Sequence, residues 1–397
     1  MTERELRAAL RSAPTDPAAR ERSWRVVKAA YHELPLMPRQ RRPRARRAGF
    51  ALVACLVAAL AVTAVTRAPT DALARWLRDA VGAESSSPAP TLGRLPVDGR
   101  LLVTAGDSAW VVAPDGVKRR LGRYAGATWS PRGLFVAAWQ GIELTALEPD
   151  GDVRWSLEAP ATVRTARWAP GDGYRIAYVA GSALRIVNGD GTGDRRLAAV
   201  RAAVAPAWRP AGAGHVLAWV DARGRVRVTD VDGGRELWRS KPLSGVRALA
   251  WSPDAAYLVV LSTRAVVFLR DDGFRAAVLG LLPEQSASSA TWTPGGEAAV
   301  VLRDAVANRS ELALLNPGGL RHRVLFTAPG RLGAPAWSPD GRVLLVPWPD
   351  GDQWLLFAPQ RKRHPVDVVQ GVAAQLAPGA TRARFPSAVE WAPAARP

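Results

Sequence analysis

The chain has 397 residues, of which 48% are hydrophobic, and this apolar content is enough for a sizeable core and excludes wholesale disorder. Its formal net charge is +19, but 54 basic residues include only four lysines, Lys28, Lys118, Lys241 and Lys362. With 35 Gly and 32 Pro, this arginine bias indicates a GC-rich genome more than a polyanion-binding protein, so nucleic-acid binding is not favoured.

Residues 1–47 form a basic segment that is predicted to hold two short helices. Asp16 and Pro17 suit the N-cap and first position of the second helix, which runs to about Leu34. Two such helices bury little between themselves, so an apolar stripe on the second indicates a face for a cytoplasmic partner. A membrane surface, or simply a soluble tail, are the alternatives. The stripe consists of Trp24, Val27, Tyr31 and Leu34.

Residues 48–66 are predicted to form a transmembrane helix. The run AGFALVACLVAALAVTAVT contains no charge, and as a helix it would span roughly 28 Å, close to the hydrocarbon thickness of a bilayer. Six arginines precede it, which by the positive-inside rule predicts a cytoplasmic N-terminus and an extracytoplasmic location for residues 67–397. These are Arg39, Arg41, Arg42, Arg44, Arg46 and Arg47.

Two other readings of the apolar run stay open but are less favoured. A cleaved signal peptide normally starts with a short charged segment, whereas 47 residues precede this run. The stretch LVAC at 52–55 resembles a lipoprotein signal with Cys55 as the lipidated residue. However, the apolar run continues well beyond Cys55, whereas such a signal lies at the end of its apolar stretch.

Residues 67–94 are predicted to connect the membrane helix to a folded domain. The sequence TDALARWLRDAVG at 70–82 gives an amphipathic helix, and its apolar face would rest on lipid with Trp76 at the headgroups. Packing of this face against the following domain is the alternative. The stretch ESSSPAPTLG at 84–93 is typical of a flexible linker.

Residues 95–397 contain a repeat marked by Trp-x-Pro. Successive tryptophans are 39, 40, 43, 41, 45 and 54 residues apart, and each interval holds about four short apolar or alternating runs separated by turn residues. Four short strands per 40 or so residues are typical of a propeller blade. The fold class is therefore predicted to be all-β, a seven-bladed β-propeller, with six or eight blades as alternatives. The repeated residues are Trp129, Trp168, Trp208, Trp251, Trp292, Trp337 and Trp391.

These tryptophans are interpreted as wedges between adjacent blades rather than as a ligand site. The spacing suggests that each closes the fourth strand of a unit, and that Ser-Pro-Asp-Gly then forms a type I turn into the next blade's innermost strand. A closed ring would leave no exposed sheet edge. The last unit carries about ten extra residues, which we expect within 365–385.

The Trp-Ser/Thr-Pro junctions resemble the WD-type and TolB-type propeller repeats of bacterial envelope proteins. The likeness covers roughly residues 95–397, and the clearest examples begin at Trp129, Trp251 and Trp337. Arg209 and Ala169 stand where Ser or Thr is usual. Two units, EPDGDVRW at 148–155 and DVDGGRELW at 230–238, are similar to the Trp-docking repeats of quinoprotein-like (PQQ-like) propellers. Because only two units show this pattern, we interpret it as blade packing and expect no quinone cofactor.

No catalytic, cofactor-binding or metal-binding residues are predicted. The histidines His32, His215, His322 and His364 stand far apart, and each is expected to be a surface or hydrogen-bonded residue. Neither a His-Glu-x-x-His nor a Gly-x-Ser-x-Gly motif occurs. The stretch NGDGTGD at 188–194 imitates the start of a calcium loop, but Ala199 occupies the position of the bidentate glutamate, so a hairpin turn is favoured.

The leading functional hypothesis is a non-enzymatic, single-pass membrane protein of the bacterial envelope. Its propeller would bind a protein, peptide or cell-wall ligand outside the membrane, and residues 1–47 could tether a cytoplasmic partner. This layout is similar to membrane-anchored anti-sigma factors, although their zinc motif is absent. The alternatives are an extracytoplasmic propeller enzyme, glycan-acting or lyase, with a carboxylate site in the central funnel, and a polyanion-binding surface.

Overall fold

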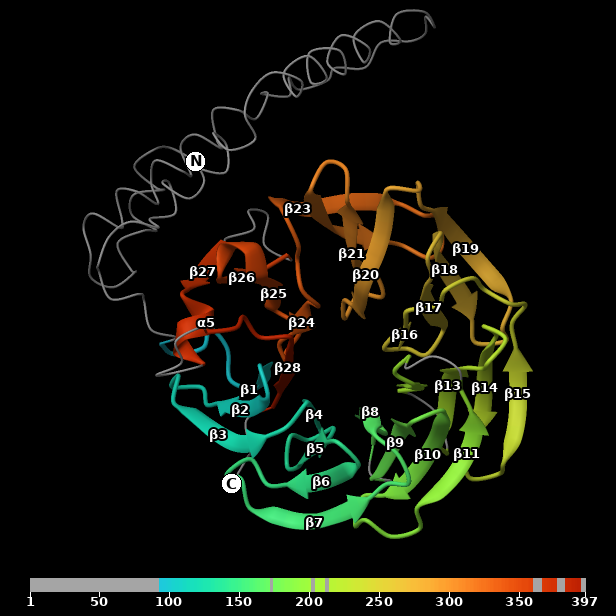
Figure 1. Cartoon of the computed structure of the whole chain (residues 1–397). Coiled ribbons are helices and arrows are strands. Elements are labelled where there is room, and N and C mark those ends of the chain that lie inside the picture. The colour runs from blue at the N-terminus through green and yellow to red at the C-terminus, as the bar shows by residue number, and fades with distance from the viewer. Residues whose placement is uncertain are drawn as a thin grey trace, which may run out of the picture. The chain divides into compact units, whose positions relative to one another are not determined.

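The computed structural model describes residues 93–171, 174–200, 204–210, 214–359, 366–376 and 383–393 (Figure 1). By its internal contacts the chain divides into a unit Met1–Ser87 and a unit Pro88–Pro397, and all described residues belong to the second. The predicted partner face at Trp24–Leu34, the arginines Arg39–Arg47, the transmembrane helix and most of the predicted connector lie outside the described residues. In the described part of the chain, no helix has the length and apolar character needed to cross a bilayer.

Seven four-stranded antiparallel sheets are arranged as blades around a central axis, which confirms the predicted seven-bladed, all-β propeller (Figure 1). Listed from the innermost to the outermost strand, blades 1 to 3 are built as follows. Blade 1 comprises β28 (Ala388–Ala392), β1 (Arg100–Ala105), β2 (Ser108–Val112) and β3 (Lys118–Arg123). Blade 2 comprises β4 (Gly126–Trp129), β5 (Val136–Gln140), β6 (Glu143–Leu147) and β7 (Val153–Glu158). Blade 3 comprises β8 (Val163–Trp168), β9 (Arg175–Ala180), β10 (Ala183–Asn188) and β11 (Arg195–Ala199).

Blades 4 to 7 repeat this plan. Blade 4 comprises β12 (Ala207–Trp208), β13 (Val216–Val220), β14 (Val226–Asp230) and β15 (Arg235–Arg239). Blade 5 comprises β16 (Ala248–Trp251), β17 (Tyr257–Leu261), β18 (Ala265–Arg270) and β19 (Arg275–Gly280). Blade 6 comprises β20 (Gln285–Trp292), β21 (Ala298–Asp304), β22 (Arg309–Leu315) and β23 (His322–Pro329). Blade 7 comprises β24 (Ala336–Trp337), β25 (Leu344–Trp348), β26 (Gln353–Phe357) and β27 (Val366–Gln370), with the short helices η2 (Pro349–Gly351) and α5 (Val372–Gln375).

The predicted division into blades is wrong by one strand. Each Trp-x-Pro tryptophan lies at or next to the end of the innermost strand, and the turn after it leads into the second strand of the same blade. A repeat has a period but no intrinsic start, so its spacing cannot decide which strand begins a blade. The turn itself has the expected form, because the Gly341 amide donates to the Ser338 carbonyl (2.8 Å) and the Ser338 hydroxyl to Asp340 (2.6 Å).

The ring is closed by the two ends of the described chain. β28 pairs antiparallel with β1 over five residue pairs, from Arg100↔Ala392 to Thr104↔Ala388. This pairing supplies blade 1 with its innermost strand and its Trp-x-Pro tryptophan, Trp391. Closure does not remove every sheet edge, contrary to the expectation from sequence. Each blade ends in an outermost strand whose outer edge pairs with no other strand of its sheet.

Successive strands run in opposite directions, so the turns of each blade are divided between two faces of the propeller. The face that we call the Trp face carries the Trp-x-Pro turns and the turns between third and fourth strands. The opposite face, the connection face, carries the turns between second and third strands and the connections from blade to blade. Of the last unit's extra stretch, which was expected within 365–385, the described residues that follow β27 lie on this second face and include α5.

The hydrophobic core consists of seven clusters, each built from strands of two adjacent blades. Every cluster includes one of the seven Trp-x-Pro tryptophans. In one of them, Trp129 of blade 2 packs with Leu102 and Val111 of blade 1. Five of these tryptophans are buried, while Trp337 and Trp391 are partly buried. The rings therefore occupy equivalent positions at the seven seams between blades.

Indole hydrogen bonds connect neighbouring innermost strands. The Nε1 of Trp208, Trp251 and Trp292 donates to the carbonyls of Arg167, Ala207 and Ala250, at 2.9, 3.2 and 3.0 Å respectively. Each acceptor residue immediately precedes the tryptophan of the preceding blade. The same side chain thus fills a seam with apolar surface and satisfies a carbonyl at the inner edge of the neighbouring sheet.

The two Gly-x-x-x-Trp units also pack between blades. Trp155 on β7 donates to the Gly189 carbonyl (2.8 Å), and Trp238 on β15 donates to the Asp271 carbonyl (2.7 Å). Each acceptor lies in the turn between the third and fourth strands of the next blade. The indoles also cover a glycine of that turn so closely that a Cβ on Gly191 or Gly273 would lie 2.8 Å from the ring.

Candidate functional site

A charged group spans the innermost strands of blades 1 to 3. Glu390 on β28 accepts hydrogen bonds from the Thr128 hydroxyl (2.9 Å) and the Trp129 amide (3.0 Å) of β4. Its other oxygen lies 3.6 Å from the guanidinium of Arg167 on β8. The Trp129 amide is on the inner edge of its sheet, so the carboxylate satisfies a donor that has no strand partner on that side. The geometry joins the ring-closing strand to the next two blades.

Glu390 is the only carboxylate on the innermost strands of the described residues, and the other ionisable residues there are Arg164 and Arg167. The enzyme alternative expects three or more converging Asp, Glu or His residues in the funnel. Throughout the described part of the chain, no group of three His, Cys, Asp or Glu residues could hold a metal ion. Along the described innermost strands, an ion pair and small or apolar side chains therefore stand where the enzyme alternative requires a carboxylate cluster.

A second polar cluster lies on the Trp face between blades 3 and 4. The Nδ1 of His215 lies 2.6 Å from Asp232, whose other oxygen pairs with Arg175 at 2.8 Å. Arg175 also donates to the Asn188 side chain at 2.6 Å, and the His215 ring packs edge-on against Trp208. His215 is thus hydrogen-bonded. His322 is exposed at the start of β23, and His32 and His364 lie outside the described residues.

The stretch 188–194 forms the hairpin turn between β10 and β11. Its Gly191 amide donates to the Asn188 carbonyl at 3.0 Å. Asp194 accepts from the buried Tyr178 hydroxyl (2.7 Å) and pairs with Arg185 (2.5 Å). Burial and the neighbouring carboxylate raise the pKa of Tyr178. These contacts connect Asp194 to the strands of blade 3 and so stabilise the turn.

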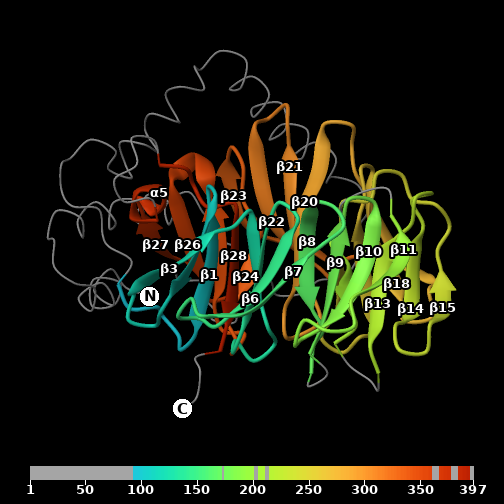
Figure 2. The same ribbon diagram turned by 60° about the horizontal axis from the view of Figure 1, so that its bottom comes forward.

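Blade 6 rises above its neighbours on the connection face (Figure 2). Its strands β21 and β22 have seven residues each, whereas the second and third strands of other blades have five or six. The tip of this hairpin exposes Val306 to 85%, and the connection into the blade exposes Leu282 to 57%. The amide of Ala305 donates to the Glu284 carbonyl at 2.9 Å, so the hairpin tip and the connection lie side by side.

The raised edge of blade 6 is held rigidly. Arg303 donates to the Gly330 carbonyl (2.5 Å) and to the Asn308 side chain (2.9 Å), which ties the hairpin to the connection into blade 7. Asp304 accepts from the Ala307 amide at 2.8 Å and so shapes the turn. Two apolar side chains are therefore displayed on a fixed backbone, as suits a surface that contacts another protein.

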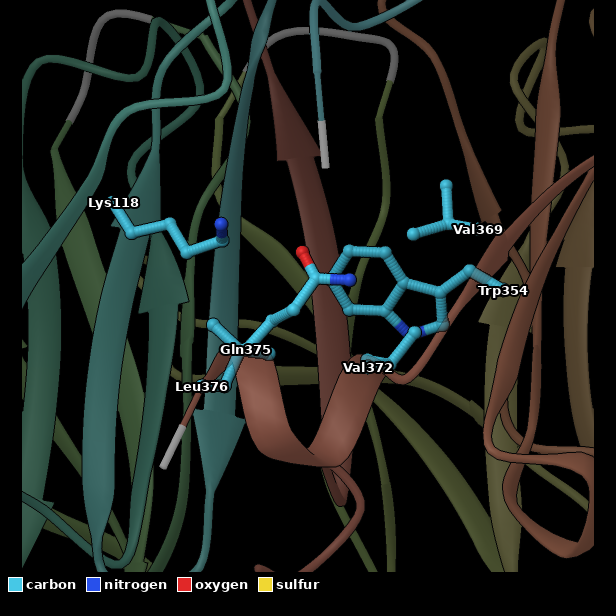
Figure 3. A pocket seen from close by; sticks show the side chains of 6 residues that line it. All are labelled: Lys118, Trp354, Val369, Val372, Gln375 and Leu376. Atoms are coloured by element: carbon cyan, nitrogen blue, oxygen red, sulfur yellow. The ribbon is translucent and has the colours of Figure 1, made fainter. Parts of the chain in front are cut away.

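A small hollow lies between the outer parts of blades 7 and 1 (Figure 3). A water-sized sphere does not fit inside it, and its empty space of about 170 Å³ includes open solvent, so it is far smaller than the several hundred Å³ of typical cofactor and substrate pockets. It is lined by Lys118, Trp354, Val369, Val372, Gln375 and Leu376.

Comparisons with known proteins show WD40-type propellers as structural neighbours of this chain. A component of the "Mitotic Checkpoint Complex" superposes with a TM-score of 0.52 and 16% identity, covering 66% of this chain and 92% of its own. Hsv2 from "Kluyvelomyces marxianus" gives 0.51 and 12%, with coverages of 69% and 98%. The C-terminal WD40 domain of Sif2 gives 0.53 and 14%, with coverages of 70% and 84%. No family model and no curated protein matches the sequence. At these identities the likeness shows the fold alone.

The sequence predicted the seam tryptophans but not the polar groups. The residues that precede the seven tryptophans vary from blade to blade, and this variation singles out two charged positions, Glu390 and Arg167. A tabulation of that position across the repeats would have identified both. The raised hairpin has a weaker signal in the sequence, the apolar tip in DAVANRS at 304–310. Its extra length is recognised only when its strands are compared with those of the other blades.

Proposed function

We propose that this chain is a non-enzymatic, single-pass membrane protein of the bacterial envelope, whose propeller lies outside the membrane and binds a protein partner. The observation that carries the binding function is the raised edge of blade 6, with Val306 and Leu282 exposed on a braced hairpin. The fold supports it, since propellers with WD40 neighbours present rigid faces suited to protein binding or scaffolding. The membrane placement rests on the apolar run 48–66 and the arginines before it.

The binding proposal is tested by photocrosslinking in the full-length chain. A photoreactive amino acid replaces Val306 on the connection face or, as a matched control, Val117, which is 62% exposed on the Trp face. We expect a discrete crosslinked protein from position 306 and none of the same mass from position 117. Equal labelling at both positions, or none at 306, would contradict the proposal.

The membrane placement is tested by a C-terminal reporter that is active only outside the cytoplasm, compared with the same reporter placed before Arg39. We expect activity from the C-terminal fusion alone. Activity from the fusion before Arg39, with an inactive C-terminal fusion, would reverse the topology.

We further propose that residues 1–47 bind a cytoplasmic protein, so that the chain could act as a transmembrane regulator. The apolar stripe Trp24, Val27, Tyr31 and Leu34 supports this role. The test is a pull-down with full-length chain in which Trp24→Ser and Tyr31→Ser are combined. Loss of a saturable cytoplasmic partner is expected, and binding that is unchanged by both substitutions would refute the role of this stripe.

A further inference from the structure

The outermost strand of blade 7 differs from those of the other six blades. In blades 1 to 6, the pairing of the third strand with the outermost strand contains a register shift, as between Ala109 and Trp110 in blade 1. The β26–β27 pair runs from Gln353↔Gln370 to Phe357↔Val366 without one. Such bulges twist a sheet edge and discourage another strand from adding to it.

The charged residues of β27 also differ from those of the other outermost strands. The other outermost strands, β3, β7, β11, β15, β19 and β23, each contain at least one arginine, whereas β27 has the sequence VDVVQ with Asp367 as its one charged residue. Basic side chains on edge strands oppose strand addition, as bulges do. β27 therefore lacks both protections and is the most regular outer edge of the propeller.

The hollow between blades 7 and 1 lies beside this edge. Val369 of β27 forms one wall, and the Lys118 side chain enters from β3 on the other side (Figure 3). Among the described residues no acidic group pairs with Lys118, and burial lowers its pKa. Trp354, only 1% exposed, has an indole N–H without an acceptor in the described part of the chain. Because the indole N–H is itself buried, Lys118 is the donor beside this hollow that is suited to an anion.

We propose that an extended peptide segment of a partner protein adds to β27 as a fifth strand and places a carboxylate next to Lys118. A residue opposite Val369 on an added strand would have its Cβ about 4.5–5.5 Å from that of Val369. Its side chain would therefore lie on the same side of the sheet as the Val369 side chain, which lines the hollow together with Lys118. The carboxylate would pair with Lys118. The Gln375 side chain already donates to the Gln370 carbonyl (2.8 Å), so pairing would extend along Asp367–Val369.

A partner protein fits this edge better than a second copy of the chain or the residues just before the described part do. A second copy would bring another net charge of +19 to a site whose unpaired group is already cationic. The residues just before the described part, 81–92, contain Pro88 and Pro90, which cannot donate to a ladder. This inference deepens the proposed binding function and rests on it.

The test measures fluorescence anisotropy of labelled heptapeptides with the full-length chain in mild detergent. The peptides alternate threonine and leucine, with glutamate in place of the central leucine so that it lies on the leucine face, and a second set carries lysine there. We expect the glutamate set to bind at least about tenfold more tightly, as for a charged hydrogen bond. Lys118→Gln should remove most of this difference, and Lys241→Gln, at an exposed lysine in another blade, should leave it intact. Only every second amide of the added peptide would point to β27. N-methylation of these amides should abolish binding, whereas N-methylation of the intervening amides should not.

Equal binding of both peptide sets, no effect of Lys118→Gln, or tolerance of both N-methylation patterns would overturn the inference. So would dimerisation through β27 in sedimentation, or tighter peptide binding after deletion of residues 81–92, since a different occupant would then hold the edge. The N-methylated peptides leave the protein unaltered, so they keep the test valid even if a variant folds poorly. Crosslinking at Val306 tests the proposed protein-binding function independently of β27. If it persists while peptides fail to bind, this inference alone falls.

Discussion

Glu390 stabilises the ring because one carboxylate contacts three blades. It accepts from the Thr128 hydroxyl and the Trp129 amide of blade 2 and lies near Arg167 of blade 3. Replacing it with glutamine removes the charge and leaves the Arg167 guanidinium without its carboxylate. The Arg167 side chain is 41% exposed, so water partly replaces the lost carboxylate and the cost stays moderate.

We therefore expect Glu390→Gln to lower the free energy of unfolding by about 1 kcal/mol, measured by urea denaturation. Glu158→Gln, at an exposed glutamate on the outermost strand β7, is the matched control and should change little. If the two variants have equal midpoints, the carboxylate does not join the blades.

Asp221 in blade 4 gives the protein an acid-dependent contribution to stability. Burial raises the pKa of this carboxyl, but hydrogen bonds from the Arg225 amide, the Arg227 guanidinium and the Arg223 amide outweigh burial and hold the pKa below 3.8. A depressed folded-state pKa stabilises the protein above the unfolded-state pKa of about 3.9. The contribution is lost as the pH falls through the folded-state value.

We expect Asp221→Asn to lower the unfolding free energy at neutral pH and to flatten its decline below about pH 4. Urea unfolding over a pH series measures both effects, with Asp98→Asn at an exposed aspartate as the control. If the unfolding free energy of Asp221→Asn falls with decreasing pH as steeply as that of the wild type, protonation of this carboxyl does not contribute to acid unfolding.

Adjacent blades are also joined at their outer parts, where an indole covers a glycine turn. Gly273 has φ +84° and lies under the Trp238 ring, so an added Cβ would meet the indole at 2.8 Å. Gly234 has φ +65° but nothing within 4 Å of an added Cβ. The two positions share a backbone conformation that strains alanine and differ in the contact with tryptophan.

Gly234→Ala should therefore cost about 1 kcal/mol from backbone strain alone. Gly273→Ala should cost about 1–3 kcal/mol more, because the methyl group displaces the Trp238 ring. Thermal and urea unfolding measure the difference. If both variants lose a similar amount of unfolding free energy, the Trp238 ring moves at no cost, and its packing on Gly273 does not stabilise the contact between the two blades.

The sequence was sufficient for the blades and the seam tryptophans because both recur with the period of the repeat. The turn geometry also followed from Ser-Pro-Asp-Gly. The assignment of strands to blades did not, since the phase of the repeat depends on Ala388–Ala392 pairing with Arg100–Thr104 at the other end of the propeller. The Glu390–Thr128 contact joins residues 262 positions apart and exists only after that closure. The regular outer edge of β27 is recognised only when the register of the strand pairs is compared between blades.

At the scale of the whole molecule, ring closure decides how the other features are arranged. Without β28, blade 1 would lack its innermost strand, Trp391 would not fill the seam with blade 7, and Glu390 would not reach β4. The faces that we propose for partner binding would then lose their fixed spacing, because rigid display depends on the closed ring.

Thr104 and Ala388 are register partners in the closing β1–β28 pair, so their Cα atoms lie at the separation of antiparallel neighbours, about 4.5–5.5 Å. That separation suits a disulfide. The most direct test replaces both with cysteine in a chain carrying Cys55→Ser, oxidises the protein mildly and maps disulfide-linked peptides by mass spectrometry. The closed propeller predicts an intramolecular link between positions 104 and 388 in the monomer. Free thiols at both positions, or links formed only between chains, would contradict it.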